Sequence, residues 1–343
     1  YVELKRSSNN MVGRCPFHSE KTPSFTVFRD TQSFYCFGCQ AAGDVITFIR
    51  KIENLDYIDA VRFLCEKSGL TFPEPDENEK EFSKKRERIL SLNKETARYF
   101  FNVLTTPEGS GARDYIAKRR LLPATVKHFG LGFAPDNWDS LTRHLNRLGY
   151  KNDEILEAGL AKKGKNGKLF DFFRNRLMFP IIDLRGNVIG FGGRVLDNSL
   201  PKYLNSTDTL VFKKKQNLFA LNFAKNGGNE RLILAEGYMD VISMHQAGFT
   251  EAVATLGTAI TAEQARLMSR YAKKIVIAYD SDSAGQNAVK KASAYLNETG
   301  VDIKILAVSE GKDPDEYIRE HGKEKFEMEL SGAKNKVEYE LDK

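Results

Sequence analysis

The sequence predicts a multidomain protein that combines α+β and α/β folds. Its 343 residues are enough for two or three domains of ordinary size. Residues 1–72 read as short strands followed by two helical patterns, whereas the last third alternates strands with helices of about 10–16 residues. Such alternation is typical of βαβ units around a parallel sheet. Different parts of the chain are therefore expected to follow different fold classes.

Charge is unevenly distributed along the chain, whose net charge is +6. Residues 1–109 carry 16 basic and 16 acidic side chains, residues 110–230 carry 21 and 11, and residues 231–343 carry 15 and 19. The middle segment is therefore +10 and the last is −4, which favours nucleic acid as a partner. An ordinary solvated surface explains the same charge equally well.

Membrane and secretion signals are absent from the sequence as given. No apolar run approaches the ~18 residues of a membrane span, and no charged and then apolar leader opens the chain. We therefore expect a cytoplasmic protein with no membrane partner.

Residues 1–72 contain four side chains with metal-ligand spacing, in "CPFH" and "CFGC". A two-residue spacer lets both ligands of a pair reach one tetrahedral ion, and with four protein ligands no coordination position stays open. The pattern predicts one structural Zn2+ in a zinc-ribbon domain, held by Cys15, His18, Cys36 and Cys39. Cys65 lies on the apolar face of an expected helix and is predicted to be a core residue.

Aromatic and basic residues surround these two turns. They either stack single-stranded bases or form the small core of the ribbon: Phe25, Phe34, Tyr35 and Phe37, with Lys21 and Arg29.

Residues 73–87 hold two prolines and a run of acids and bases, and they read as an exposed linker that grades into a helix. Residues 88–228 start helical and become β-rich. Within them, apolar runs on both sides of 183–187 predict a β-hairpin with Gly186 in the turn.

Cations in this middle segment are placed where a phosphate could bind. Arg194 follows two glycines in "GFGGRV", Lys202 stands in "PKYLNS", and Lys214 is the centre of "KKK". Glycines let backbone N–H groups approach a phosphate, and the side chains supply charge. A bulge at the glycines and a solvated lysine loop are the alternative interpretations.

Residues 229–315 contain acidic side chains directly after apolar strands. Because the carboxyl ends of parallel strands meet at one edge of a sheet, these acids are expected to converge. Carboxylates in such a crevice bind Mg2+ at phosphoryl-transfer sites. The expected ligands are Glu236, Asp240, Asp280, Asp282, Asp313 and Asp315. A single D-x-D pair can instead cap a helix.

Residues 316–343 are charged and are expected to form a helical tail. No G-x-x-x-x-G-K-[ST] sequence occurs, which excludes a P-loop motor from the chain as given.

The four zinc ligands and the series "RLMFPI", "GFGGRV", "PKYLNS", "AEGYMDV", "YDSDSAG" and "KDPDE" resemble the bacterial replicative DNA primases of the DnaG type over nearly the whole chain. The resemblance implies a zinc ribbon, a linker, and an RNA-polymerase domain whose catalytic half, residues 229–315, has the Toprim fold. It implies synthesis of short RNA primers from ribonucleoside triphosphates on single-stranded DNA, with an RNA–DNA hybrid as product.

The resemblance also implies roles for individual residues. Glu236, Asp280 and Asp282 correspond to catalytic acids, and together with Asp240, Asp313 and Asp315 they would hold Mg2+ or Mn2+. The basic surface that binds template or nucleotide would consist of Arg119, Arg194, Lys202 and Lys214. Arg120 offers an alternative register for Arg119.

Family members begin upstream of Tyr1 and carry a C-terminal domain that binds the replicative helicase. The chain given ends at Lys343 without it, so stimulation by the helicase is expected to be lost. Two other functions remain open: a Toprim nuclease or topoisomerase, and a non-catalytic zinc-ribbon binder of single-stranded DNA. No motif nominates a nucleophilic tyrosine for a topoisomerase.

Overall fold

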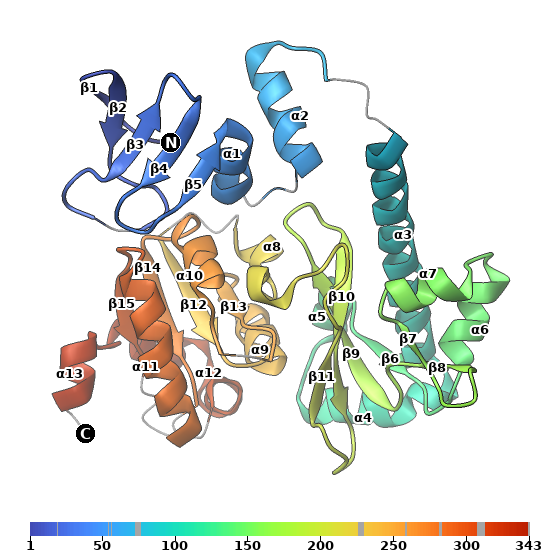
Figure 1. Ribbon diagram of the computed structural model, residues 1–343. Helices are drawn as coiled ribbons and strands as arrows, with labels where there is room; N and C mark the ends of the chain where they lie inside the picture. Colours follow the sequence, from blue (N-terminus) through green and yellow to red (C-terminus); the bar gives the residue numbers. More distant parts are fainter. Residues whose placement is uncertain are drawn as a thin grey trace.

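The computed structural model has a zinc ribbon above two packed subdomains (Figure 1). We call residues 88–228 the basic subdomain and residues 229–315 the α/β subdomain. No helix in the described part of the chain is long and apolar enough to cross a membrane. The structure describes residues 1–18, 20–53, 55, 57–72, 77–225, 230–257, 259–280, 283–306 and 313–341.

The zinc ribbon is an antiparallel sheet followed by two helices. Its five strands lie in the sheet in the order β1-β2-β3-β4-β5, which is also their order in the sequence. Phe25 and Phe34 are buried in its core, which confirms the core interpretation for these two rings, whereas Phe37 is 68% exposed. Cys65 is buried, as predicted. The elements are β1 Lys5–Ser7, β2 Asn10–Gly13, β3 Phe25–Phe28, β4 Ser33–Cys36, β5 Ala42–Asp44, α1 Val45–Glu53 and α2 Tyr57–Ser68.

The basic subdomain is built on the long helix α3, which spans Glu77–Thr105. The helix therefore already occupies residues 77–87, most of the segment expected as a linker. Four strands form an antiparallel sheet in the order β11-β10-β9-β6. The elements that follow α3 are η1 Pro107–Gly109, α4 Ser110–Lys118, α5 Pro123–Phe129, β6 Gly132–Ala134, α6 Ser140–Arg147, α7 Asn152–Glu157, β7 Ala161–Lys163, β8 Leu169–Asp171, β9 Arg176–Ile182, β10 Val188–Val195 and β11 Tyr203–Asn205.

The hairpin predicted around residues 183–187 is present between β9 and β10. The Asp183 N–H donates to the Asn187 carbonyl oxygen at 2.9 Å. Gly186 has a φ of 88°, which a residue with a Cβ rarely adopts. The hairpin carries Arg194 at its far end, so the turn helps to set the place of one predicted phosphate ligand.

The α/β subdomain has the parallel sheet that the sequence predicts. Its strands lie in the order β13-β12-β14-β15, and each neighbouring pair is parallel. The basic subdomain ends with η2 Lys214–Gln216 and α8 Leu221–Ala224. The α/β subdomain then contains β12 Arg231–Ala235, α9 Tyr238–Ala247, β13 Ala252–Ala254, α10 Ala262–Ser269, β14 Lys274–Ala278, α11 Ser283–Asn297 and β15 Asp302–Ile305, and α12 Pro314–Ser331 and α13 Lys336–Leu341 follow it.

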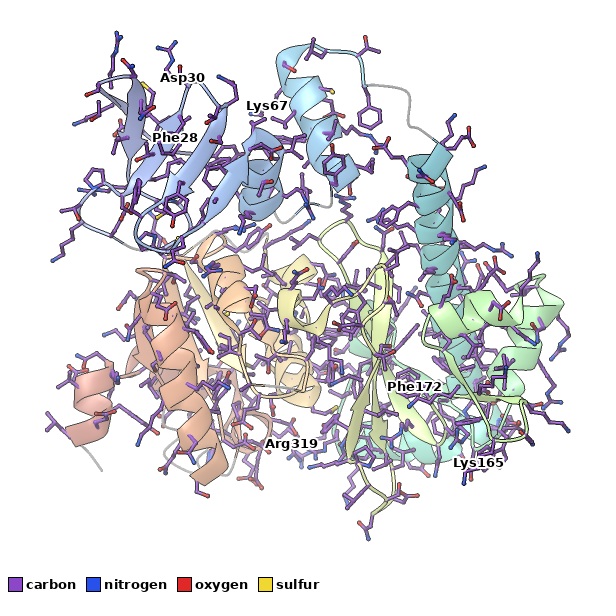
Figure 2. The ribbon with its side chains drawn as sticks, viewed as in Figure 1. Phe28, Asp30, Lys67, Lys165, Phe172 and Arg319 are labelled. Atoms are coloured by element: carbon purple, nitrogen blue, oxygen red, sulfur yellow. The ribbon has the colours of Figure 1, made fainter. Side chains whose placement is uncertain are left out.

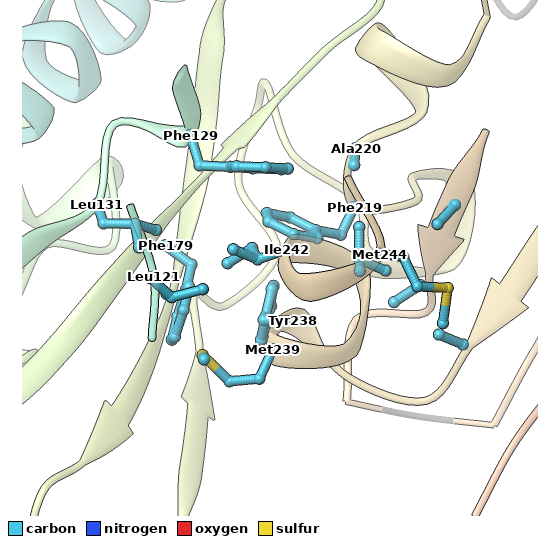
Figure 3. Close-up of a cluster of buried hydrophobic side chains, with 14 of the residues drawn as sticks. Leu121, Phe129, Leu131, Phe179, Phe219, Ala220, Tyr238, Met239, Ile242 and Met244 are labelled. Carbon is cyan, nitrogen blue, oxygen red and sulfur yellow. The ribbon is translucent and has the colours of Figure 1, made fainter. Parts of the chain in front are cut away.

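One hydrophobic cluster joins the two subdomains (Figure 3). The rings of Phe179 from β9 and Tyr238 from α9 stack with centroids 4.9 Å apart. Phe129 from α5 and Phe219 also stack, at 5.7 Å. Shared burial of aromatic surface fixes the basic subdomain against the α/β subdomain, and so it fixes the cations relative to the acids.

Gly192 of β10 lies against the ring of Tyr238. A Cβ added at Gly192 would lie 2.5 Å from Tyr238 Cζ. We expect Gly192→Ala to destabilise the protein by about 1–3 kcal/mol, because the ring has to move in a packed core. Thermal melting measures the effect. Gly111→Ala in α4 is the matched control, since its added Cβ meets nothing within 4 Å and alanine favours a helix. Equal melting of both variants would contradict the close packing.

Candidate active site and zinc centre

The four predicted zinc ligands come together in space. Cys15 and His18 follow β2, and Cys36 and Cys39 stand at the turn between β4 and β5. Their ligand atoms all lie within 4.8 Å of one another. Cys15 Sγ lies 3.8 Å from Cys39 Sγ, and Cys36 Sγ lies 3.7 Å from His18 Nδ1. With Zn–S bonds of about 2.3 Å, the edge of a tetrahedral site is about 3.8 Å long. The donor set and its spacing therefore fit one structural Zn2+.

Glu20 organises this centre from behind. One of its carboxylate oxygens accepts from the Cys15 N–H at 2.7 Å, and the other lies 3.3 Å from His18 Nε2. Although burial alone would raise the pKa of Glu20, hydrogen bonds from Ser24 and the Cys15 N–H lower it. A carboxylate on Nε2 leaves Nδ1 free for the metal, which is the usual outer-shell arrangement. Glu20 was not predicted from the sequence, although it stands only two residues after His18.

The expected acids gather at the carboxyl ends of β12 and β14. Glu236 follows β12, Asp280 follows β14, and these two strands are direct neighbours. The Asp280 N–H donates to Glu236 Oε1 at 3.3 Å. Asp313 caps α12 by accepting from the Glu316 N–H at 2.7 Å. Asp282, one of the expected ligands, lies outside the described residues.

Asp240 provides electrostatic evidence that the acids converge. It stands in the first turn of α9, where its carboxylate accepts from the Gly237 N–H at 3.1 Å. Burial raises its pKa well above the ordinary value, and Asp313, Asp280 and Asp315 raise it further. Several carboxylates that repel one another while sharing a site are the ligand set that a hard divalent cation neutralises. The described acids are therefore of the ligand type that Mg2+ or Mn2+ prefers.

Gly285 of α11 is packed against this cluster. A Cβ at that position would overlap the Asp280 carbonyl oxygen and lie 2.9 Å from Glu236 Oε1. Only glycine lets α11 approach the ends of the two strands so closely.

We expect Asp240→Asn to stabilise the protein when no Mg2+ is added. A carboxyl group whose pKa is raised in the folded state favours folding at low pH, and this stability is lost as the pH rises through the raised pKa. At pH 8 the variant should therefore melt above the wild type. Added Mg2+ should raise the melting temperature of the wild type more than that of the variant. Asp302→Asn, at an exposed position of β15, is the control. A lower melting temperature of Asp240→Asn without Mg2+ would contradict the repulsion.

Asp315 belongs to the cluster but faces other partners. It is completely buried. One oxygen pairs with the Arg119 guanidinium, and the other accepts from the Ser243 hydroxyl and lies 3.4 Å from Arg319 Nε. Both oxygens are therefore already engaged by protein groups.

A cleft of about 660 Å³ reaches the acidic cluster at Asp313, the one expected acid among its lining residues. The structure brings Arg119, Arg194 and Lys202 together in it, while their binding role stays a prediction. Its charged lining also includes Lys118, Arg319 and Asp313. Figure 2 shows Arg319 where the α/β subdomain faces the basic subdomain. Lys118 and Arg319 were missed, although Lys118 directly precedes Arg119 and Arg319 stands one helical turn after Asp315.

Aromatic rings hold the Arg194 side chain in this cleft. Its guanidinium carbon lies 4.4 Å from the centroid of Tyr115 and 5.9 Å from that of Tyr203. Stacking on rings fixes the plane of a guanidinium group and leaves its edge available for a phosphate.

Arg119 and Lys214, two of the predicted basic residues, differ in their position relative to this cleft. Arg119 lines the cleft and pairs with Asp315, whereas Arg120 is exposed and donates to the Arg319 carbonyl oxygen at 3.3 Å. The geometry therefore favours the register at Arg119. Lys214 does not line this cleft. It begins η2, and its carbonyl oxygen accepts from Gln264 of α10 at 3.0 Å.

Comparisons with known proteins agree with this arrangement. Three family models match the chain: a CHC2 zinc finger over residues 1–80, the N-terminal domain of the DNA primase catalytic core over 99–225, and a Toprim-like domain over 233–318. The DNA primase of Clostridium acetobutylicum is 47% identical over 100% of this chain and 57% of its own length. That of Deinococcus radiodurans is 40% identical, over 99% and 59%.

Solved structures give the same result. The Aquifex aeolicus primase, with zinc binding and RNA polymerase domains, superposes with a TM-score of 0.69 at 35% identity, covering 99% of this chain and 82% of that one. A DnaG primase catalytic domain bound to ssDNA gives 0.66 at 37% identity, covering 74% and 83%. The chain spans about 57% of the length of the Clostridium relative. It belongs to the DnaG-type DNA primase family.

Proposed function

We propose that this chain is a primase, an RNA polymerase that makes short RNA primers from ribonucleoside triphosphates on single-stranded DNA for replication. The observation that carries the proposal is the position of the acids Glu236, Asp240 and Asp280 beside a cleft lined by Arg119, Arg194 and Lys202. Acids that hold a divalent cation next to cations that hold phosphates are the parts that nucleotidyl transfer requires.

The residues divide this work by their chemistry. Glu236, Asp240 and Asp280, with Asp282 and Asp313, would hold Mg2+ or Mn2+, which neutralises charge on the phosphate oxygens when bound. Arg194, stacked between two tyrosines, and Lys202 would hold phosphates of template or nucleotide. Alternatively, Glu236 would act as the general base that takes the proton of the attacking 3′-hydroxyl.

Membership of this family also indicates the template and the other partners of the chain. A catalytic domain from it has been solved bound to ssDNA, which supports single-stranded DNA as template here. Ribonucleoside triphosphates and the RNA–DNA hybrid product follow from the reaction. The relatives are longer than this chain, and the replicative helicase is proposed to bind through their additional length. These partners would be met in the cytoplasm, the location expected from the sequence.

The test is RNA synthesis on a defined template. We would incubate the chain with single-stranded DNA, labelled ribonucleotides and Mg2+ or Mn2+, and separate the products by length. RNA oligomers should require template and metal and should disappear in Asp280→Asn, while the control Asp302→Asn keeps activity. Nicked DNA instead of RNA would indicate a Toprim nuclease, and binding without products would indicate a non-catalytic binder. Either result would overturn the proposal.

A further inference from the structure

A second cleft, of about 520 Å³, lies between the zinc ribbon and the α/β subdomain. It shares no lining residue with the cleft beside the acids. One wall comes from α1 and from the zinc-binding turn at Cys39, and the other comes from α10 and its C-terminal end. The cleft therefore depends on both domains.

The lining of this second cleft is strongly basic. Arg50 and Lys51 stand on the ribbon side, Arg266 and Arg270 stand on the α10 side, and Glu263 is the one acid among the lining residues. Across the part of the chain that the structure describes, none of these four cations forms an ion pair. The Arg270 guanidinium instead donates to the Lys51 carbonyl oxygen, and burial lowers its pKa. Asp44 acts electrostatically on Arg50, and Glu53 acts on Arg270, but the lining of the cleft itself has four cations and one acid. Excess positive charge in a concave site attracts an anion.

The backbone of the lysine triplet is held next to this cleft. Gln264 of α10 donates from its side-chain amide to the carbonyl oxygens of Lys214 and Asn217, at 3.0 and 2.8 Å. The Thr261 hydroxyl donates to the Lys215 carbonyl oxygen at 2.7 Å. Three hydrogen bonds thus hold the backbone of η2 against α10, and Gln216 of η2 lines the cleft. Lys214, which lies away from the first cleft, is placed beside the second.

We propose that this cleft binds the phosphate backbone of a single-stranded nucleic acid and is a second strand contact, separate from the active site. The cations come from two domains and line the same cleft, which suits a chain of phosphates. A compact triphosphate is usually cradled by a glycine-rich turn or nest of N–H groups, and no glycine is among the described lining residues. The inference rests on the proposed function only for the identity of the anion.

A strand in this position would touch the zinc ribbon and the polymerase domain at once. Contacts from two linked modules to one strand strengthen each other through effective concentration. The affinity for a single strand should therefore fall more steeply with salt concentration than it would if only the cleft beside the acids contacted phosphates.

The test is binding of a fluorescent single-stranded oligo(dT) without nucleotides, followed by anisotropy over a range of salt concentrations. Lys51→Glu combined with Arg266→Glu should weaken binding roughly tenfold and reduce the slope of log K against log salt by about 1.4, because each phosphate contact with a single strand contributes about 0.7. Lys94→Glu combined with Arg147→Glu makes the same charge change on α3 and α6, outside both clefts, and should leave the slope unchanged.

Three results would overturn the proposal. The first is equal affinity and slope for the two double variants. The second is displacement of oligo(dT) by ATP that is strong in the wild type and lost in the cleft variant, which would assign the cleft to a free triphosphate. The third concerns the double variant Arg50→Gln/Lys51→Gln. If it loses binding and its melting temperature also falls, these side chains hold the zinc ribbon against the α/β subdomain instead of binding a strand. Asp280→Asn should bind oligo(dT) like the wild type, so failure of the polymerase proposal would be recognised separately.

Discussion

Cys36→Ser should unfold the zinc ribbon while the rest of the chain stays folded. Cys36 is fully buried, and its sulfur lies beside both Cys15 and His18. The ribbon core contains few residues besides the metal ligands, and structural zinc contributes roughly 10–16 kcal/mol to the folding of small zinc domains. No comparable core replaces this energy, so the ribbon is expected to be unfolded at room temperature without zinc.

Limited proteolysis and zinc release measure this effect. In Cys36→Ser, cleavage should remove the first ~70 residues and leave a stable fragment that melts like the basic and α/β subdomains of the wild type. Cys65→Ser is the matched control, because this buried thiol stands outside the zinc ligand set and should retain zinc. Among the described residues, polar contacts of the ribbon with the remainder include Asp59 to Arg185 and Arg270 to the Lys51 carbonyl oxygen. A single global transition in Cys36→Ser would contradict the independence of the domains.

The features that the sequence predicted well are local ones. Zinc ligands two residues apart, a turn with Gly186, and acids directly after apolar strands are all encoded within a few residues. Glu236 follows β12 and Asp280 follows β14. Because these two parallel strands are neighbours and end at the same edge of the sheet, the two acids lie together. For this reason the grouping of the four Cys and His side chains, and that of Glu236 with Asp280, could be predicted from spacing.

Partners far apart in the chain could not be predicted in this way. Arg119 and Asp315 are 196 residues apart, and only the tertiary fold brings the C-terminal end of α4 to the first turn of α12. Phe25 and Phe37 look alike in the sequence, yet the first is 2% and the second 68% exposed. Lys214 was grouped with Lys202 by charge, but the hydrogen bond from Gln264 places it on the side of α10.

Asp315→Asn should destabilise the protein by about 3–5 kcal/mol, because it leaves the half-buried Arg119 guanidinium without its anion. For a domain of this size, the melting temperature should fall by roughly ten degrees. The loss should be similar with and without Mg2+, since both oxygens of Asp315 are engaged by Arg119, Ser243 and Arg319. Asp302→Asn should melt like the wild type.

The sign of this effect separates two roles that one acidic cluster can contain. Asp240→Asn removes repulsion and should raise the melting temperature without Mg2+, whereas Asp315→Asn removes an attraction and should lower it. A double-mutant cycle with Arg119→Gln makes the distinction quantitative, because residues in direct contact couple by about 0.5–3 kcal/mol. Two results would contradict this role of Asp315: a coupling energy near zero, or a higher melting temperature of Asp315→Asn without Mg2+. Either would mean that Asp315 is a metal ligand and that its ion pair with Arg119 contributes little to the packing of the two subdomains.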